Sequence, residues 1–224
     1  MSTRLSRELD YLKQALTKLD ATGHNGFEGL LACIFTAVTN KQFRLAGSGS
    51  QHGKDGSTAE ATGMVAFEAK CYTGYINKNE VFSKLTEIIG ADRLPDLWVL
   101  GATIEVKTQI VDPLVGAAGK SGINLLILDW SPASTIPSLV IACALARNET
   151  IAFLEAELDD QALVSKATAT LAAVADHERF EQFSRPILEV LHGSLWDTQG
   201  SAFESGSRTK PQSRKGTKKN ELII

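Results

Sequence analysis

Two charged residues, Glu68 and Lys70, lie inside an otherwise apolar stretch, MVAFEAKCYTG (residues 64–74). Because side chains alternate between the two faces of a strand, a strand here places this carboxylate and this ammonium group next to each other on one face. The opposite face then carries four side chains suited to a core, Val65, Phe67, Ala69 and Cys71. The pattern predicts a strand that is anchored through its apolar face and presents a carboxylate and an ammonium group on the other.

A second carboxylate, that of Asp55, lies upstream in the glycine-bounded turn GKDG. Glycine allows the sharp bend that brings Asp55 beside Glu68. Paired carboxylates suit Mg²⁺ or Mn²⁺, which take oxygen ligands and complete their shells with water and substrate phosphate oxygens. Such an ion acidifies water and neutralises phosphate charge, while a lysine beside it orients the nucleophile or stabilises the phosphorane charge. The chemistry that this set of groups favours is phosphodiester hydrolysis.

The elements before the site are predicted from apolar periodicity. Helical stripes indicate helices over 5–19 and 26–39, the second with Asn25 as its N-cap and Glu28 three residues later, in the pattern of a capping box. A short strand at 41–47, a glycine- and serine-rich loop and the strand at 64–72 together predict a hairpin.

The elements after the site alternate between helix and strand. A helix is predicted over 79–89, strands over 95–102 and 123–130, and a helix between them that is interrupted at Asp112–Pro113. The runs LWVL and LLIL are expected to be central, doubly buried strands, and residues 137–192 are mostly helical in pattern. The fold predicted is α/β, a mixed central sheet flanked by helices, with extra helices at its C-terminal end.

The length of 224 residues favours one domain. We expect a core over 1–136, a helical extension of the same domain over 137–196, and a disordered basic tail or linker over 197–224. After Asp197, six cations face only Glu204 and Glu221, whereas residues 1–197 carry 17 Lys and Arg against 24 Asp and Glu. An acidic body is unusual for a nucleic-acid binder, so phosphate contacts are expected from a local patch or from the tail.

Composition also restricts location and metal class. No apolar run approaches the roughly 20 residues that span a bilayer, and the N-terminal residues lack the apolar core of a secretory signal. Three widely spaced cysteines, Cys33, Cys71 and Cys143, match neither a zinc site nor a disulfide framework. The expected location is the cytoplasm, without membrane contact.

Asp55, twelve intervening residues and Glu68-Ala69-Lys70 together resemble the PD-(D/E)xK nuclease superfamily. The fuller run GFEGLLACIF…FRLAGSGSQHGKDGS…VAFEAKCY is similar to its Mrr-like branch, and the resemblance covers residues 26 to about 130. One departure is Lys54, which stands where the superfamily pattern has proline.

The resemblance implies a restriction-endonuclease-like fold and a role for each matching residue. Asp55 and Glu68 would hold Mg²⁺ or Mn²⁺, Lys70 would act on the nucleophile, Glu28 would be an accessory acid and Gln51 would lie near the site. The implied activity is a metal-dependent endodeoxyribonuclease that contacts DNA mainly through phosphates.

The same resemblance implies a biological setting. The chain would be the effector of a bacterial anti-phage or restriction system, a homodimer or higher oligomer with a fused or separate ATPase or sensor module. The alternatives are a nuclease that acts on RNA, and a non-catalytic DNA-binding or oligomerisation module on the same fold.

Three other interpretations of these residues stay open at this point. Asp96, eight intervening residues and Glu105-Val106-Lys107 repeat the acidic pattern, although no second strand is predicted to join its parts. Glu68 and Lys70 could instead lie on the solvated face of an edge strand, with a cross-strand ion pair. Glu28 could serve only as a helix cap.

A nucleotide-binding loop in LVGAAGKSG is excluded on mechanism. A phosphate-binding loop follows a strand and opens a helix, whereas this segment ends a predicted helix and leads into a strand. Gly119 and Gly122 are therefore expected at the C-cap and in the following turn.

Overall fold

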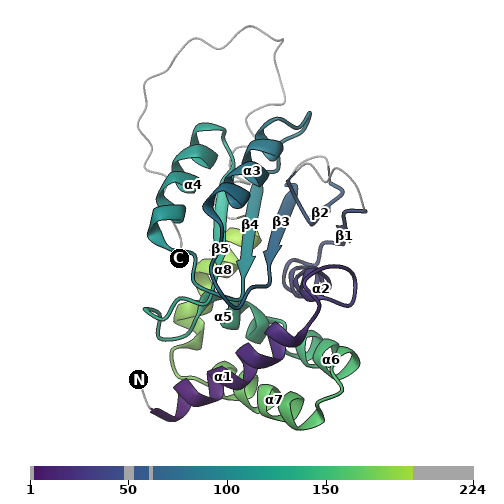
Figure 1. Cartoon of the computed structure of the whole chain (residues 1–224), viewed down its shortest axis with the longest axis vertical. Coiled ribbons are helices and arrows are strands. Elements are labelled where there is room, and N and C mark those ends of the chain that lie inside the picture. Colours follow the sequence, from purple (N-terminus) through teal and green to yellow (C-terminus); the bar gives the residue numbers. More distant parts are fainter. Residues whose placement is uncertain (1–2, 48–52, 61–62, 194–224) are drawn as a thin grey trace, which may run out of the picture.

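The computed structural model describes residues 3–47, 53–60 and 63–193 of the chain (Figure 1). The strands within them are β1 (Phe43–Leu45), β2 (Gly56–Thr58), β3 (Val65–Lys70), β4 (Leu97–Ala102) and β5 (Asn124–Leu128). The helices are α1 (Thr3–Lys18), α2 (Phe27–Thr39), α3 (Lys78–Ile89), α4 (Thr108–Lys120), α5 (Ser138–Leu145), α6 (Arg147–Glu157), α7 (Gln161–Ala175) and α8 (Phe180–Leu191). The predicted tail, 197–224, lies outside the described residues.

The strands form one mixed sheet in the order β1-β2-β3-β4-β5. β1, β2 and β3 are antiparallel neighbours, and β3, β4 and β5 are parallel. The predicted α/β class and mixed sheet are confirmed. β2 is a short strand in a segment that the sequence pattern assigned to a loop, because Gly-Ser-Thr shows no apolar alternation. The predicted hairpin is therefore a three-stranded meander.

β5 lies at one end of the strand order, so the prediction that it is a central strand is wrong. Its first two residues are not buried, whereas its last three are. The run LLIL is apolar because helices cover both faces of the sheet at that end of the strand. A strand at the edge of a sheet can be covered in this way as well as a central one, so the apolar run does not distinguish the two positions. β4, buried along its whole length, is the strand that matches the prediction.

The alternation predicted for β3 is present. Val65 and Phe67 belong to one apolar cluster, with the partly buried Ala69 and Cys71 packed against it. Ala66 belongs to a second cluster, on the opposite face, which includes apolar residues of α3 and α4. Glu68 and Lys70 share the parity of Ala66 and lie on the α3 side of the sheet.

The helices after β5 share a core with the first two helices and the sheet. One cluster contains apolar residues of α1, α2, α5, α7, α8 and strands β3 to β5. Figure 1 shows α1, α6 and α7 gathered at the end of the molecule away from α3 and α4. A hydrogen bond from Thr170 Oγ1 on α7 to the Glu8 carbonyl on α1 (2.7 Å) fixes this packing.

Two helix boundaries differ from prediction. The N-cap of α2 is Gly26 instead of Asn25. The amide of Phe27 donates to the Asp20 carbonyl (2.7 Å), so carbonyls of the preceding loop satisfy the helix N-terminus without a side chain. A Cβ atom at Gly26 would collide with the Asp20 carbonyl oxygen, which is why glycine stands there.

The α4 helix runs through Pro113 without the interruption predicted at Asp112–Pro113. Pro113 lies in the second turn, where it removes a single backbone bond, and its exposed position leaves the freed carbonyl near solvent. At the other end, Ser121 is the C-cap and Gly122 adopts φ +75°, which suits the turn into β5. Gly122 is in the turn as expected, but Gly119 is a helical residue and not the C-cap.

Within the described part, no helix combines the length and apolar character needed to cross a membrane.

Candidate metal and phosphate site

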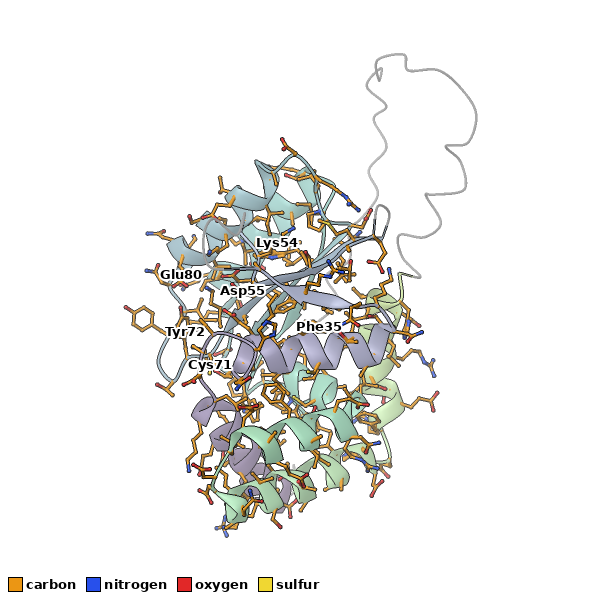
Figure 2. All side chains as sticks on the ribbon, turned by 90° about the vertical axis from the view of Figure 1, so that its right-hand side faces the viewer. Phe35, Lys54, Asp55, Cys71, Tyr72 and Glu80 are labelled. Carbon is orange, nitrogen blue, oxygen red and sulfur yellow. The ribbon has the colours of Figure 1, made fainter. Side chains whose placement is uncertain are left out.

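Asp55, Glu68 and Lys70 line one cavity of about 530 Å³, beside the end of β3. Other parts of its wall come from the α1–α2 loop, the first turn of α2, Ala46 after β1, and helix α3. Figure 2 shows three of the lining side chains, Asp55, Tyr72 and Glu80, in one part of the molecule. The structure therefore brings together the three residues that the alternation and the glycine turn selected.

Asp55 is held against β3 by two hydrogen bonds. Its amide donates to the Phe67 carbonyl (2.8 Å), and its Oδ2 accepts from the Ala69 amide (2.7 Å). The turn requires Gly53, with φ +74°, because a Cβ there would collide with the Lys84 carbonyl of α3. The carboxylate is thus fixed beside the strand that carries Glu68.

Lys70 lies between two carboxylates. Its Nζ is 2.7 Å from Glu68 Oε1 and 2.6 Å from Glu80 Oε1 on α3. Glu68 is 1% exposed and Lys70 6% exposed, and β3 has neighbours on both sides in the sheet. The interpretation of these residues as the solvated face of an edge strand with a cross-strand ion pair is therefore wrong, because the two carboxylate partners of Lys70 lie on its own strand and on α3.

Burial and neighbouring charges shift the pKa values of Glu68, Asp55 and Lys70. Burial, and then repulsion from Asp55, raises the pKa of Glu68 from 4.5 to about 7, although Lys70 opposes the shift. Burial also raises the pKa of Asp55. Although burial alone lowers it, the pKa of Lys70 is raised by Glu68 and Glu80, so this ammonium keeps its proton.

The residues fit a divalent cation. Glu68 Oε2 is buried and has no hydrogen-bond partner within the described structure. The cavity is lined by four carboxyl groups, those of Glu28, Asp55, Glu68 and Glu80, against two ammonium groups, those of Lys70 and Lys84. A cation between Asp55 and Glu68 would relieve their repulsion and satisfy the unpartnered oxygen.

Asp55 and Glu68 would be the two protein carboxylates available to such a cation. No group of three or more His, Cys, Asp or Glu side chains is placed to hold a metal among residues 3–47, 53–60 and 63–193. Mg²⁺ typically takes one or two protein carboxylates and completes its octahedron with water and phosphate oxygens. Asp55 and Glu68 meet that requirement.

Glu28 lines the same cavity, but its contact differs from the predicted cap. Its Oε2 accepts from the Gly23 amide (2.9 Å), which closes the α1–α2 loop. Burial raises the pKa of Glu28, and repulsion from Asp55 adds to the shift. Glu28 is near enough to the site to act on it electrostatically. Gln51, the other candidate from the family resemblance, lies outside the described residues.

Sequence reasoning missed Glu80 and Lys84, four residues apart on α3, and did not select Tyr72 as a site residue. The Tyr72 hydroxyl lies 2.8 Å from Glu80 Oε1 and 3.0 Å from Oε2. Although burial alone raises it, hydrogen bonds from Lys70 and Tyr72 lower the pKa of Glu80. The available signal was the i, i+4 spacing of Glu80 and Lys84 beside the apolar stripe of α3.

The second acidic pattern does not assemble. Asp96 precedes β4 and accepts from the Met64 amide (2.9 Å), whereas Glu105 follows β4 and is exposed. The six residues of β4 separate them by about 20 Å, at 3.3 Å per residue. Asp96 ties two strands together at the opposite end of the sheet from Glu105.

Comparisons with protein-family models, with curated proteins and with solved structures found no match.

Proposed function

We propose that this chain is a metal-dependent endonuclease that hydrolyses DNA phosphodiester bonds. The observation that carries the proposal is the convergence of Asp55, Glu68 and Lys70 in one cavity, with Glu68 Oε2 buried and unpartnered. Burying two carboxylates beside one ammonium group costs folding free energy, and a cation with a phosphate ligand would balance their charges. Clustered ionisable groups with displaced pKa values are typical of catalytic sites.

Each side chain has a role that follows from its position. Asp55 and Glu68 hold the cation, and Glu28 adds negative charge at the cavity wall. Bound there, Mg²⁺ or Mn²⁺ supplies charge neutralisation at the scissile phosphate and a more acidic water. Lys70, which stays protonated, donates hydrogen bonds to the attacking oxygen or to the phosphate. Lys84 offers a second cation for a neighbouring phosphate.

The wider setting is part of the same proposal. The mixed sheet with Asp55 at the start of β2 and Glu68 and Lys70 on β3 supports a restriction-endonuclease-like fold. We propose a cytoplasmic effector of a bacterial anti-phage or restriction system, working with an ATPase or sensor module. Cutting both strands of a duplex calls for two sites, so the active form is a homodimer or higher oligomer.

The test is cleavage of supercoiled plasmid by the purified chain in Mg²⁺ or Mn²⁺. Asp55→Asn and Lys70→Ala are expected to lose at least about 100-fold in rate, since each removes a group that stabilises transition-state charge. Glu105→Gln, an exposed carboxyl outside the site, is the matched control and should cleave like the parent chain.

Three outcomes contradict the proposal in different ways. Loss in Glu105→Gln with retention in Lys70→Ala would move the site to the second acidic pattern. Cleavage of RNA but not of DNA would change the substrate. DNA binding without cleavage in either metal would favour the non-catalytic module.

A further inference from the structure

Lys70 has two carboxylate partners that come from different elements. Glu68 lies two residues away on β3, and Glu80 lies in the first turn of α3, at nearly equal distances of 2.7 and 2.6 Å from Nζ. The proposed cation uses Glu68 and, being positive, repels the ammonium next to it. With Glu68 as its single anion, Lys70 would be driven from the site whenever the cation arrived.

Glu80 is held in place without help from Glu68. The Tyr72 hydroxyl donates to its carboxylate at 2.8 and 3.0 Å. The backbone of Tyr72 is itself fixed by Thr103, whose Oγ1 accepts from the Tyr72 amide (2.9 Å) and donates to the Tyr72 carbonyl (2.8 Å). The anchor for Lys70 thus rests on the segments that follow β3 and β4.

The helix that carries Glu80 is also fixed at its N-terminus. Asn77 caps α3 through its side chain, which accepts from the Asn79 amide (3.0 Å). Glu80 follows within the first turn, where the helix dipole favours a carboxylate. Its side chain is 38% exposed, so Glu80 forms the outer partner of Lys70 and Glu68, 1% exposed, the inner one.

We propose that Glu80, held by Tyr72, is a positioning residue that retains the Lys70 ammonium in the site while Glu68 binds the divalent cation. The inference rests on the proposed function. Lys70 then changes from two carboxylate partners to one without leaving the cavity, so its donors stay directed at the bound phosphate. Glu80 does not touch substrate in this scheme and acts through Lys70.

The anchoring can be tested without metal or DNA. Lysine ammonium protons give resolvable NMR signals when hydrogen bonds and burial slow their exchange with water. The Lys70 signal is expected in the parent chain, in Glu68→Ala and in Glu80→Ala, and its loss is expected in the double variant. The Trp98 indole signal, from a side chain with no exposed area, reports that each variant is folded.

Loss of the Lys70 signal in Glu68→Ala alone would overturn the inference, because Glu80 would then be unable to hold the ammonium. Persistence in the double variant would also overturn it. On addition of Mg²⁺ the signal should remain in the parent chain and disappear in Glu80→Ala. Persistence in Glu80→Ala with bound Mg²⁺ would show that Glu80 is not needed.

Kinetics supply the second readout. Glu80→Ala should lower kcat between about 10- and 100-fold with KM for DNA and Mg²⁺ affinity unchanged, because Lys70 is misplaced while the metal ligands stay intact. Tyr72→Phe should show a smaller loss of the same kind. Glu155→Ala, the same change at an exposed position on α6, should cleave like the parent chain. Equal loss in that control, or a rise in KM alone in Glu80→Ala, would contradict the role.

The two proposals fail separately. If the parent chain does not cleave DNA, the proposed function fails, while the metal-free NMR signals still decide whether Glu80 holds Lys70. If the parent chain cleaves DNA but the Lys70 NMR signal does not depend on Glu80 as described, the proposed function stands and the positioning role of Glu80 is wrong.

Discussion

At the residue scale, the free-energy cost of burying the Glu68 carboxylate depends on which group balances its charge. The carboxyl is buried beside Asp55, and only one of its oxygens has a partner, Lys70. Burial, and then repulsion from Asp55, raises its pKa to about 7, because without a cation protonation is the available way to remove the buried charge. A cation would replace the proton, so metal binding should release protons below neutral pH.

The raised pKa gives a prediction for stability without metal. Between pH 4.5 and about 7 the folded chain holds a proton on Glu68 that the unfolded chain has lost. Stability due to this group therefore falls as pH rises through that window and is lowest above it. Glu68→Gln removes the effect, so its stability relative to the parent should rise by up to about 3 kcal/mol between pH 4.5 and 8.

Urea unfolding in EDTA at several pH values measures this difference in the free energy of unfolding. Only its slope with pH is used, because changes in packing at position 68 add an offset that does not depend on pH, whereas the pairing with Lys70 is already part of the raised pKa. Glu105→Gln, an exposed carboxyl, should show no such slope. A flat or falling difference for Glu68→Gln would contradict the electrostatic account of position 68.

The same scale shows what the sequence could reveal about the site. Asp55, Glu68 and Lys70 were found because period-two alternation and a glycine-bounded turn are local properties. Glu80 was missed because its contact with Lys70 depends on how α3 docks on the sheet, which local periodicity does not specify. Glu28 was found by resemblance, but its bond to Gly23 depends on the shape of the α1–α2 loop.

At the element scale, strongly periodic segments were predictable and weakly patterned ones were not. The helices α1 to α3 and strands β3 and β4 follow their apolar patterns. β2 has three small or polar residues and forms because β1 and β3 supply its backbone partners. The centre of the sheet was misplaced for a related reason, since burial of an apolar run does not reveal which strands flank it.

Helix α3 gives the element-scale prediction, because it carries Glu80 and Lys84 and is capped by Asn77. Asn77→Ala should cost about 1 kcal/mol of stability and lower the cleavage rate, because the first turn that holds Glu80 loosens. Asp160→Ala removes the cap of α7; the Asp160 side chain accepts from the Leu163 amide and also pairs with Lys18. It should cost at least as much stability and leave cleavage unchanged.

Thermal unfolding and plasmid cleavage measure the two quantities on the same preparations. Equal loss of activity in both variants would mean that cleavage follows overall stability and not the position of α3. Unchanged activity in Asn77→Ala would mean that the cap does not position Glu80.

At the scale of the whole molecule, the helical layer and the sheet share one apolar cluster, so they should unfold together. Leu171 on α7 is fully buried in that cluster. Leu171→Ala should cost about 2–5 kcal/mol. The loss should appear equally in the far-UV signal and in the hydrogen exchange of β4. Ser165→Ala, at an exposed position on the same helix, is the control.

Protection of β4 that is unchanged in Leu171→Ala would contradict a shared core. The helices after residue 137 would then be a separate unit instead of an extension of the same domain. The sequence indicated their helical character, but the packing of α7 on α1 and of α5 on the sheet is a tertiary property that it did not specify.

The proposed site depends most on whether Asp55 and Glu68 bind one divalent cation between them. The most direct measurement is the anomalous scattering of Mn²⁺ in crystals of the parent chain soaked at about pH 8, with Asp55→Asn crystals beside them. We predict one peak within coordination distance of both carboxylates, with Lys70 retained on Glu80, and no peak in Asp55→Asn. A peak at Asp96 or Glu105, or none at Asp55 and Glu68, would contradict the account.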